Sequence, residues 1–350
     1  MVNLTPEQEA RAVALHKRAT VVEGHSDFPA EVARCRNRGE TVVLETHHLP
    51  NLELGGVDIE VLTVGCDEPA LDVSNTPLKV LKVMDDLHQE LQESDKFRLI
   101  TTYADVARAK NTGKIGILLH LEGARPIRED LFLLRTYYRL GLRQVGLTWN
   151  QRNLAADGCG EPQGGGGLSN FGRRLIEELN RLNMILDLSH VGERSFMDAI
   201  ELTKTPPVAS HSTARAVCDF PRNLSDDQIR ALADRGGAMG LCFYGSFVGD
   251  PPTLEALMDH VDHIVELVGV DHISLGPDYI DYIMDVMIEE EDRMKERGVD
   301  YISFDYVKGL ETVAQLPNVT RALVARGYED EGIEKILGGN LLRIYKEILR

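Results

Sequence analysis

The sequence is poor in cysteine, and its five cysteines form no paired motif. Cys35, Cys66, Cys159, Cys218 and Cys242 are odd in number and scattered along the chain. This spacing predicts reduced thiols and argues against a disulfide framework or a zinc site built from CxxC pairs. A metal bound by this chain is therefore expected to be held by nitrogen and oxygen atoms.

Long hydrophobic runs and an excess of positive charge are also absent. No apolar stretch is long enough to span a bilayer, and the first residues, MVNLTPEQEARAVALHKRA, lack the apolar core of a secretory signal. The last residues, YKEILR, form no hydrophobic anchor. The 38 Lys and Arg residues face 56 Asp and Glu residues, which gives a formal charge of −18. We therefore expect a cytoplasmic protein that binds neither nucleic acid nor a membrane.

A glycine-rich nucleotide-binding motif is missing as well. The segment CGEPQGGGGLSN (159–170) carries four consecutive glycines, but it lacks the spacing of a phosphate-binding loop. It is expected to be a flexible loop, and a cofactor-binding oxidoreductase is set aside.

What the sequence does contain is a regular alternation of strand-like and helix-like segments. Segments with helical periodicity, such as 77–94 and 254–269, lie between most of the apolar runs. The runs expected to be strands are 20–24, 57–64, 114–120, 143–148, 183–189, 206–210, 237–243 and 271–276.

Eight strands in this alternation predict an α/β fold, a TIM-type (β/α)8 barrel in regular or distorted form. Helical additions are expected at the N- and C-termini. The whole chain, 1–350, is predicted to be one barrel domain with a charged helical insertion at 283–310. An open doubly wound sheet alternates in the same way and stays an alternative.

Ionisable side chains recur where the predicted strands end. The carboxyl ends of barrel strands meet at one face, so these groups are expected to be neighbours in space. Three histidines and two acidic residues among them suit two divalent ions that share Glu122, with Zn, Mn, Co and Fe all compatible. The residues at the strand ends are His25, Asp27, Glu122, His190, His211 and Asp278.

Each of these residues also has a structural interpretation. A histidine at a strand end is commonly a hydrogen-bonded core residue, Glu122 could cap a turn, and Asp278 could be an ordinary loop residue. The repetition at successive strand ends favours the metal site. His120 is expected to orient a ligand, whereas His47 and His48, in a polar connection, are expected to be solvated or packed.

Arg222 lies in the segment HSTARAVCDFPRN, which follows the sixth predicted strand. A guanidinium at the active face could hold a substrate carboxylate in a bidentate pair. A surface arginine in a loop is the alternative.

These residues together resemble the membrane (renal) dipeptidase family of zinc metallopeptidases, within the amidohydrolase-like barrels. The likeness runs from EGHSDFP to GGNLLRIYKEIL. It is most specific in GHSDFP, LEGA, LDLSHV, SHSTARAVCDFPRNLSDDQIRALADRGG and HIVELVGVDHISLGPD. The resemblance implies that His25 and Asp27 bind one zinc ion and that Glu122 bridges to a second.

The same resemblance supplies the remaining roles. It implies that His190 and His211 bind the second zinc ion and that Asp278 serves the substrate amine and proton transfer. It also implies that Arg222 binds the substrate carboxylate. Glu122 and Asp278 are therefore the catalytic candidates, and Arg222, Trp149 and Tyr244 the substrate-binding candidates.

Trp149 marks a departure from the family pattern. Many members read LTH after the fourth strand, where this chain reads LTWNQRN. An indole donates a single hydrogen bond and carries no charge, so stabilisation of the oxyanion would fall more on the metals. Alternatively, Trp149 reshapes the pocket for another substrate. The segment GPDYIDY also differs from the more usual GSDFDG, beside Asp278.

The resemblance implies a binuclear zinc dipeptidase that attacks the amide bond with a metal-bridging hydroxide and admits D-residues at the C-terminal position. It also suggests a homodimer. Two alternatives stay open: the same metal chemistry on another small amide, β-lactam or lactone, and a catalytically silent metal-binding member of the family.

Overall fold

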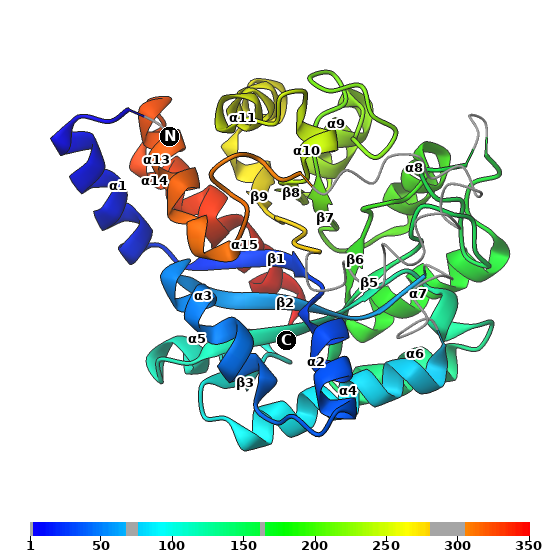
Figure 1. Ribbon diagram of the computed structural model, residues 1–350. Helices are drawn as coiled ribbons and strands as arrows, with labels where there is room; N and C mark the ends of the chain where they lie inside the picture. The colour runs from blue at the N-terminus through cyan, green and yellow to red at the C-terminus, as the bar shows by residue number, and fades with distance from the viewer. Residues whose placement is uncertain (1–2, 68–75, 162–164, 281–304) are drawn as a thin grey trace.

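In the computed structural model, which describes residues 3–67, 76–161, 165–280 and 305–350, the strands form one parallel sheet curved into a nearly closed barrel (Figure 1). The order along the sheet is β1-β2-β4-β5-β6-β7-β8-β9. The predicted TIM-type barrel is confirmed. The strands on this path are β1 (Val21–Ser26), β2 (Val57–Cys66), β4 (Ile115–Glu122), β5 (Leu142–Gly146), β6 (Ile185–Asp187), β7 (Val208–Ser212), β8 (Ala238–Leu241) and β9 (Ile273–Leu275).

All eight strands lie where the apolar runs predicted them, within a few residues at each end. A ninth strand, β3 (Phe97–Leu99), was not predicted, since three residues are too few to show an alternating pattern. It pairs with β4 outside the main order of strands. The predicted insertion at 283–310 falls largely outside the described residues.

Helices wrap the outside of the barrel and alternate with the strands. Their apolar faces pack against the sheet, and several begin at Ser or Thr residues that cap the first turn. These helices are α2 (Phe28–Asn37), α3 (Leu49–Leu54), α4 (Pro77–Glu93), α5 (Tyr103–Asn111), α6 (Leu131–Arg139), α7 (Asn170–Leu182), α8 (Glu193–Leu202), α9 (Asp226–Asp234), α10 (Gly245–Val248) and α11 (Leu254–Val268).

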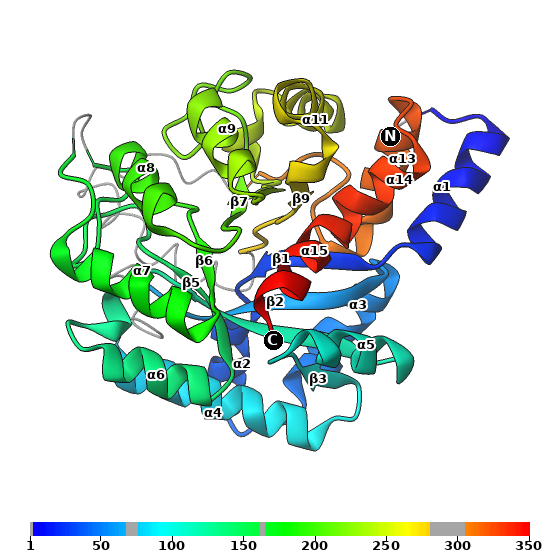
Figure 2. The ribbon, with the colours of Figure 1, turned by 180° about the vertical axis from the view of Figure 1, so that it is seen from behind.

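The terminal helices pack together beside the barrel, as the predicted additions require. Helix α1 (Pro6–Arg18) lies along α13 (Pro317–Ala325) and α14 (Asp330–Glu334) in both views (Figures 1 and 2). Ion pairs tie the two ends of the chain together: Arg11 Nη2 lies 2.7 Å from Asp330 Oδ1. No helix in the described part of the chain is both long and apolar enough to cross a bilayer.

The interior of the barrel is apolar near the start of the strands and carries the proposed ligands near their carboxyl ends. Helix α15 (Asn340–Ile348) runs across the barrel beside β1 and β9 (Figure 2), and its buried Ile344 and Tyr345 belong to an apolar cluster with Val22 and Leu118. These two strand residues precede the ionisable groups of β1 and β4. The proposed ligand groups follow these apolar positions, toward the carboxyl ends of the strands, where barrel active sites form.

Closure of the barrel depends on a close approach between its first and last strands. Ser26 forms a parallel bridge with Tyr279, just after β9. A Cβ atom at Gly24 would lie 2.4 Å from the Leu275 carbonyl oxygen, so only glycine permits this approach.

Candidate active site

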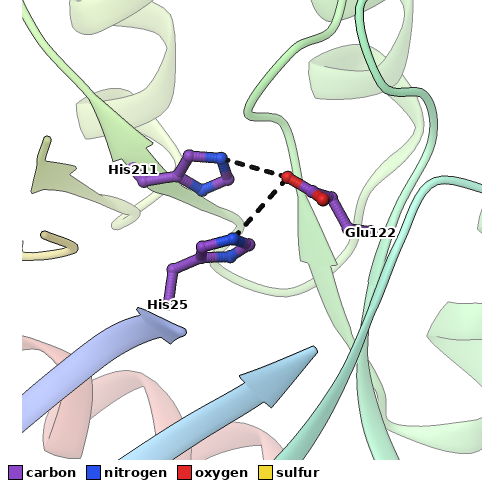
Figure 3. A group of neighbouring side chains, drawn as sticks. All are labelled: His25, Glu122 and His211. Atoms are coloured by element: carbon purple, nitrogen blue, oxygen red, sulfur yellow. Dashed lines mark ion pairs between the residues drawn. The ribbon is translucent and has the colours of Figure 1, made fainter. Parts of the chain in front are cut away.

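Glu122, at the end of β4, is the centre of the polar cluster. Its Oε1 atom lies 3.6 Å from His25 Nε2, 3.0 Å from His190 Nε2 and 3.2 Å from His211 Nε2. Figure 3 shows His25 of β1 and His211 of β7 directed at the same carboxylate. Their rings stack with centroids 3.7 Å apart. Three imidazoles from distant parts of the sequence thus converge on one oxygen.

A second group of ligand atoms surrounds His25. Its Nε2 atom lies 3.9 Å from Asp27 Oδ2 and 3.7 Å from Asp278 Oδ1. His25, Asp27 and Asp278 could hold one ion, as could His25, Glu122 and His211. The structure therefore brings the five predicted ligands together and places Asp278 among them.

The backbone at two of these positions is unusual. His190 and Asp278 both have a φ of +64°, in the left-handed region that non-glycine residues seldom adopt. Such a conformation costs about 1–3 kcal/mol and is found mainly where the surroundings hold it in place. At both positions it occurs just after a strand, where the side chain turns into the cluster.

The hydrogen bonds of His190 test whether the cluster fits a metal. Its Nδ1 atom lies 2.7 Å from the Oδ1 acceptor of Asn150, so Nδ1 carries the hydrogen and Nε2 has the free lone pair. The His190 Nε2 atom lies 2.9 Å from His211 Nε2 and 3.0 Å from Glu122 Oε1. Both ring nitrogens of His25 are buried and have no hydrogen-bond partner among the residues that the structure describes. The lone pair of His190 and the unsatisfied nitrogens of His25, close to the Glu122 carboxylate, fit a bound cation.

The pKa directions agree with this interpretation. Burial lowers the pKa of His190 and His211 well below the usual value, with Arg222 and the other imidazoles adding to the effect, so the rings are neutral. Burial, followed by the charges of neighbouring carboxylates, raises the pKa of Asp27 and Glu122 well above normal. A divalent ion would lower the raised pKa of the two carboxyls, because it compensates their buried charge, and it binds imidazoles in the neutral form that burial favours.

Asp187 contacts residues that neighbour the cluster. It was not predicted from the sequence. Its carboxylate accepts hydrogen bonds from the backbone N–H groups of Ser189 and Ser210 and lies 3.1 Å from His120 Nε2. These contacts, against burial, hold the pKa of Asp187 below its usual range. The His120 ring stands edge-on to His25, as a residue that orients a ligand would. The only signal in the sequence was the position of Asp187 in LDLSH.

Thiol groups also contact the site. Cys242 Sγ lies 3.7 Å from Asp278 Oδ2, and the Cys159 thiol donates to Asn150 Oδ1 at 3.2 Å. Burial raises the pKa of both thiols, so they act as donors here. These contacts were not predicted, because a cysteine that donates to a neighbouring side chain has no motif.

Arg222 lines a cavity of about 990 Å³ beside His190. Its guanidinium donates to Ser212 Oγ at 3.0 Å and to the His211 carbonyl oxygen at 2.6 Å. Its Nε atom is buried without a hydrogen-bond partner in the described structure. Arg222 is thus held against β7, the strand that carries the proposed ligand His211, and its Nε donor remains available.

The two aromatic candidates lie in different places. The Trp149 ring stacks on His190 with centroids 5.6 Å apart, at the cluster. Tyr244 is buried and packs against Phe247 and Tyr306, with centroids 5.0 and 5.9 Å away. It is not among the residues that line the Arg222 cavity.

Comparison with known families gives an independent result. A family model described as membrane dipeptidase (peptidase family M19) matches residues 9–297 and 296–350. An uncharacterised dipeptidase of Schizosaccharomyces pombe is 30% identical over 375 residues, which cover 99% of this chain and 85% of the relative. Dipeptidase tcpJ of Claviceps purpurea is 34% identical over 269 residues, which cover 75% of this chain and 58% of the relative.

Solved structures show the same likeness. An amidohydrolase from Pseudomonas aeruginosa superimposes with a TM-score of 0.81 at 26% identity, over 96% of this chain and 98% of its own. A metallopeptidase from Rhodobacter sphaeroides, liganded with a phosphinate mimic of the dipeptide L-Ala-D-Ala, gives a TM-score of 0.80 at 26% identity. That match covers 94% of this chain and 99% of the other.

Proposed function

Because the chain belongs to the membrane dipeptidase family and is thus a metal-dependent hydrolase, we propose that it cleaves the peptide bond of dipeptides with two zinc ions. The convergence of three imidazole nitrogens on Glu122 Oε1 carries this proposal. His25 and Asp27 would hold one ion and His190 and His211 the other, with Glu122 between them. Two such ions supply a nucleophilic water at neutral pH and polarise the scissile carbonyl.

Asp278 is the proposed proton carrier. Burial raises the pKa of its carboxyl to about 6, although Arg222 and Cys242 act in the opposite direction. A carboxyl with a pKa near neutrality can accept a proton from water and return it to the leaving amine. Its Oδ1 atom lies 3.7 Å from Nε2 of the proposed ligand His25, which supports this role.

Arg222 is the proposed anchor for the C-terminal carboxylate of the substrate. The guanidinium is buried at the cavity beside His190, and its Nε donor has no partner among the described residues. A charge-assisted pair with a carboxylate would satisfy that donor. The phosphinate mimic of L-Ala-D-Ala bound to the Rhodobacter sphaeroides relative supports a D-residue at the same position.

The direct test is turnover of L–L and L–D dipeptides by the zinc-loaded protein, with a chelated sample as control. Each dipeptide is paired with its C-terminal amide, which lacks the carboxylate that Arg222 would bind. We expect chelator-sensitive release of amino acids and a strong preference for the free carboxylate. Arg222→Lys retains the charge but loses the planar fork, so this preference should fall by tenfold or more.

A second candidate is the same chemistry on another small amide, β-lactam or lactone. The contact between Trp149 and His190 favours it, because the indole occupies a position where many family members carry histidine. Hydrolysis of a lactam or lactone without dipeptide cleavage would select this candidate. Bound zinc without any turnover would select the catalytically silent protein. Dimerisation stays an expectation from the family resemblance, and the cytoplasmic location stays a prediction from the sequence.

A further inference from the structure

A second group of metal-binding side chains lies on helix α2 and the segment that follows it. Glu31 and Cys35 are four residues apart in α2, so they share one face of the helix. His47 belongs to a π-helical turn, η1 (Leu44–His48), that packs beside α2. One donor atom of each of these three side chains lies within 4.8 Å of the others.

Glu40 lies beside this group and contacts the other ring nitrogen of His47. Its Oε2 atom lies 3.4 Å from His47 Nε2, while His47 Nδ1 lies 3.4 Å from Glu31 Oε1. The chain returns to α2 here, because the Glu40 N–H donates to the Cys35 carbonyl oxygen at 3.1 Å. The Glu40 side chain also contacts the Cys35 thiol. The imidazole thus lies between two carboxylates, with a thiol beside them.

His48 holds Glu31 in place. Its Nε2 atom lies 2.9 Å from Glu31 Oε2, and its ring stacks on Phe28 with centroids 3.9 Å apart. The His48 side chain is 1% exposed, whereas that of Glu31 is 23% exposed. One carboxylate oxygen is therefore fixed from within, and the other is directed at His47. An outer residue that orients a carboxylate in this way is typical of metal sites.

We propose that Glu31, Cys35 and His47 bind a zinc-like divalent ion, separate from the ions of the active site. Their oxygen, sulfur and nitrogen donors are ligands that zinc accepts, and water would complete a tetrahedral set. His47 uses one ring nitrogen, and the Cys35 thiol releases its proton as the thiolate binds. The partly exposed His47 and Glu40 side chains give the ion access from solvent.

The ion would act as a structural link. Helix α2 begins at Phe28, directly after the proposed ligand Asp27. An ion bound by Cys35 and His47 would link this helix to η1. It would thereby stabilise the start of α2, next to Asp27. The scattered cysteines give no hint of a thiol ligand, because the three donors come from two separate elements, α2 and η1.

Cobalt binding distinguishes this site from the active site. The proposed catalytic ligands are nitrogen and oxygen atoms, so a thiolate-to-Co²⁺ charge-transfer band in the near ultraviolet would report Cys35. Excess Co²⁺ is added to the metal-free full-length chain, and bound ions are counted by equilibrium dialysis. We expect the band in the wild type and its loss, with one ion fewer, in Cys35→Ser and in His47→Gln.

Cys218→Ser is the matched control, since Cys218 is a partly exposed thiol outside the group, and this variant should retain the band. Three outcomes would overturn the proposal. These are no thiolate band in the wild type at saturating Co²⁺, a band that persists in Cys35→Ser, and an unchanged ion count in both variants. Each would leave the group as a network of ion pairs around His47.

Discussion

The Nδ1 atom of His190 lies 2.7 Å from Asn150 Oδ1, and this contact fixes which nitrogen of the imidazole faces Glu122. Asn150 follows Trp149 and is buried beneath the cluster. The Cys159 thiol donates to the same Oδ1 atom, so the amide orientation is itself held. Asn150, which is not itself a proposed ligand, thus contacts the proposed metal site through His190.

Asn150→Leu should weaken metal binding by about 10–100-fold, because His190 loses the acceptor that sets its tautomer and ring orientation. Competition with a chelating dye would measure the zinc affinity of the purified protein. Asn150→Asp, which retains an acceptor oxygen, should bind zinc more tightly than the leucine variant. Equal zinc affinities for the wild type and Asn150→Leu would show that Asn150 does not orient His190.

Glu122→Gln should lower metal content and abolish activity together. The amide is a weaker ligand than a carboxylate, and Oε1 is the atom on which three imidazoles converge. Elemental analysis after gel filtration gives ions per chain, and a dipeptide assay gives turnover. Full activity in this variant would contradict a shared carboxylate.

Asp278→Asn separates proton transfer from metal binding. If Asp278 carries protons, the variant keeps its zinc and its kcat falls by about 10²–10⁴-fold. Asp278 also lies close enough to His25 and Asp27 to share an ion with them. Measurement of zinc content beside kcat decides the matter, since a parallel loss of zinc would make Asp278 a ligand.

Trp149→His should increase kcat for dipeptides by up to about tenfold if the indole limits stabilisation of the substrate oxyanion, because an imidazole can become a charged donor. Trp149→Phe keeps an aromatic ring against His190 and serves as control. Steady-state kinetics on the best dipeptide would show the change. A decrease in kcat for Trp149→His would instead mean that the indole shapes the pocket for this chain's substrate.

The pH dependence of stability can be tested far from the active site, at Asp105 of α5. Burial opposes ionisation, but hydrogen bonds from Thr102 and Thr101 and the contact with Arg108 prevail and lower the pKa of Asp105 to about 2. A depressed carboxyl pKa stabilises the fold above the unfolded value of about 3.9, and this contribution is lost as the pH falls through about 2.

Asp105→Asn should therefore lower the free energy of unfolding at neutral pH by about 1–2 kcal/mol. The difference from wild type should shrink between about pH 4 and pH 2. Urea unfolding across this range is the measurement. Asp95→Asn is the control, since its side chain is 82% exposed. A difference that stays constant with pH would assign the effect to side-chain packing.

The sequence by itself determined the strands and the proposed ligands at their ends. Alternating or continuous apolar residues predict strands. His25, Glu122 and His211 are predicted as ligands because each is a polar residue at the end of such a run. The three-residue β3 escaped this method because it is too short to show a period. The terminal helices were likewise foreseen, since their apolar faces need a partner.

Only the tertiary structure decided between a barrel and an open sheet, because the approach of Gly24 to Leu275 joins strands about 250 residues apart. It also brought Asn150 to His190 and Asp187 to His120, contacts between distant segments that leave no local pattern. The same holds for Cys35 and His47: neither belongs to a motif, and their donor atoms come close only because α2 packs on η1. Periodicity records which face of a segment is buried, whereas contacts between distant segments depend on how those faces pack.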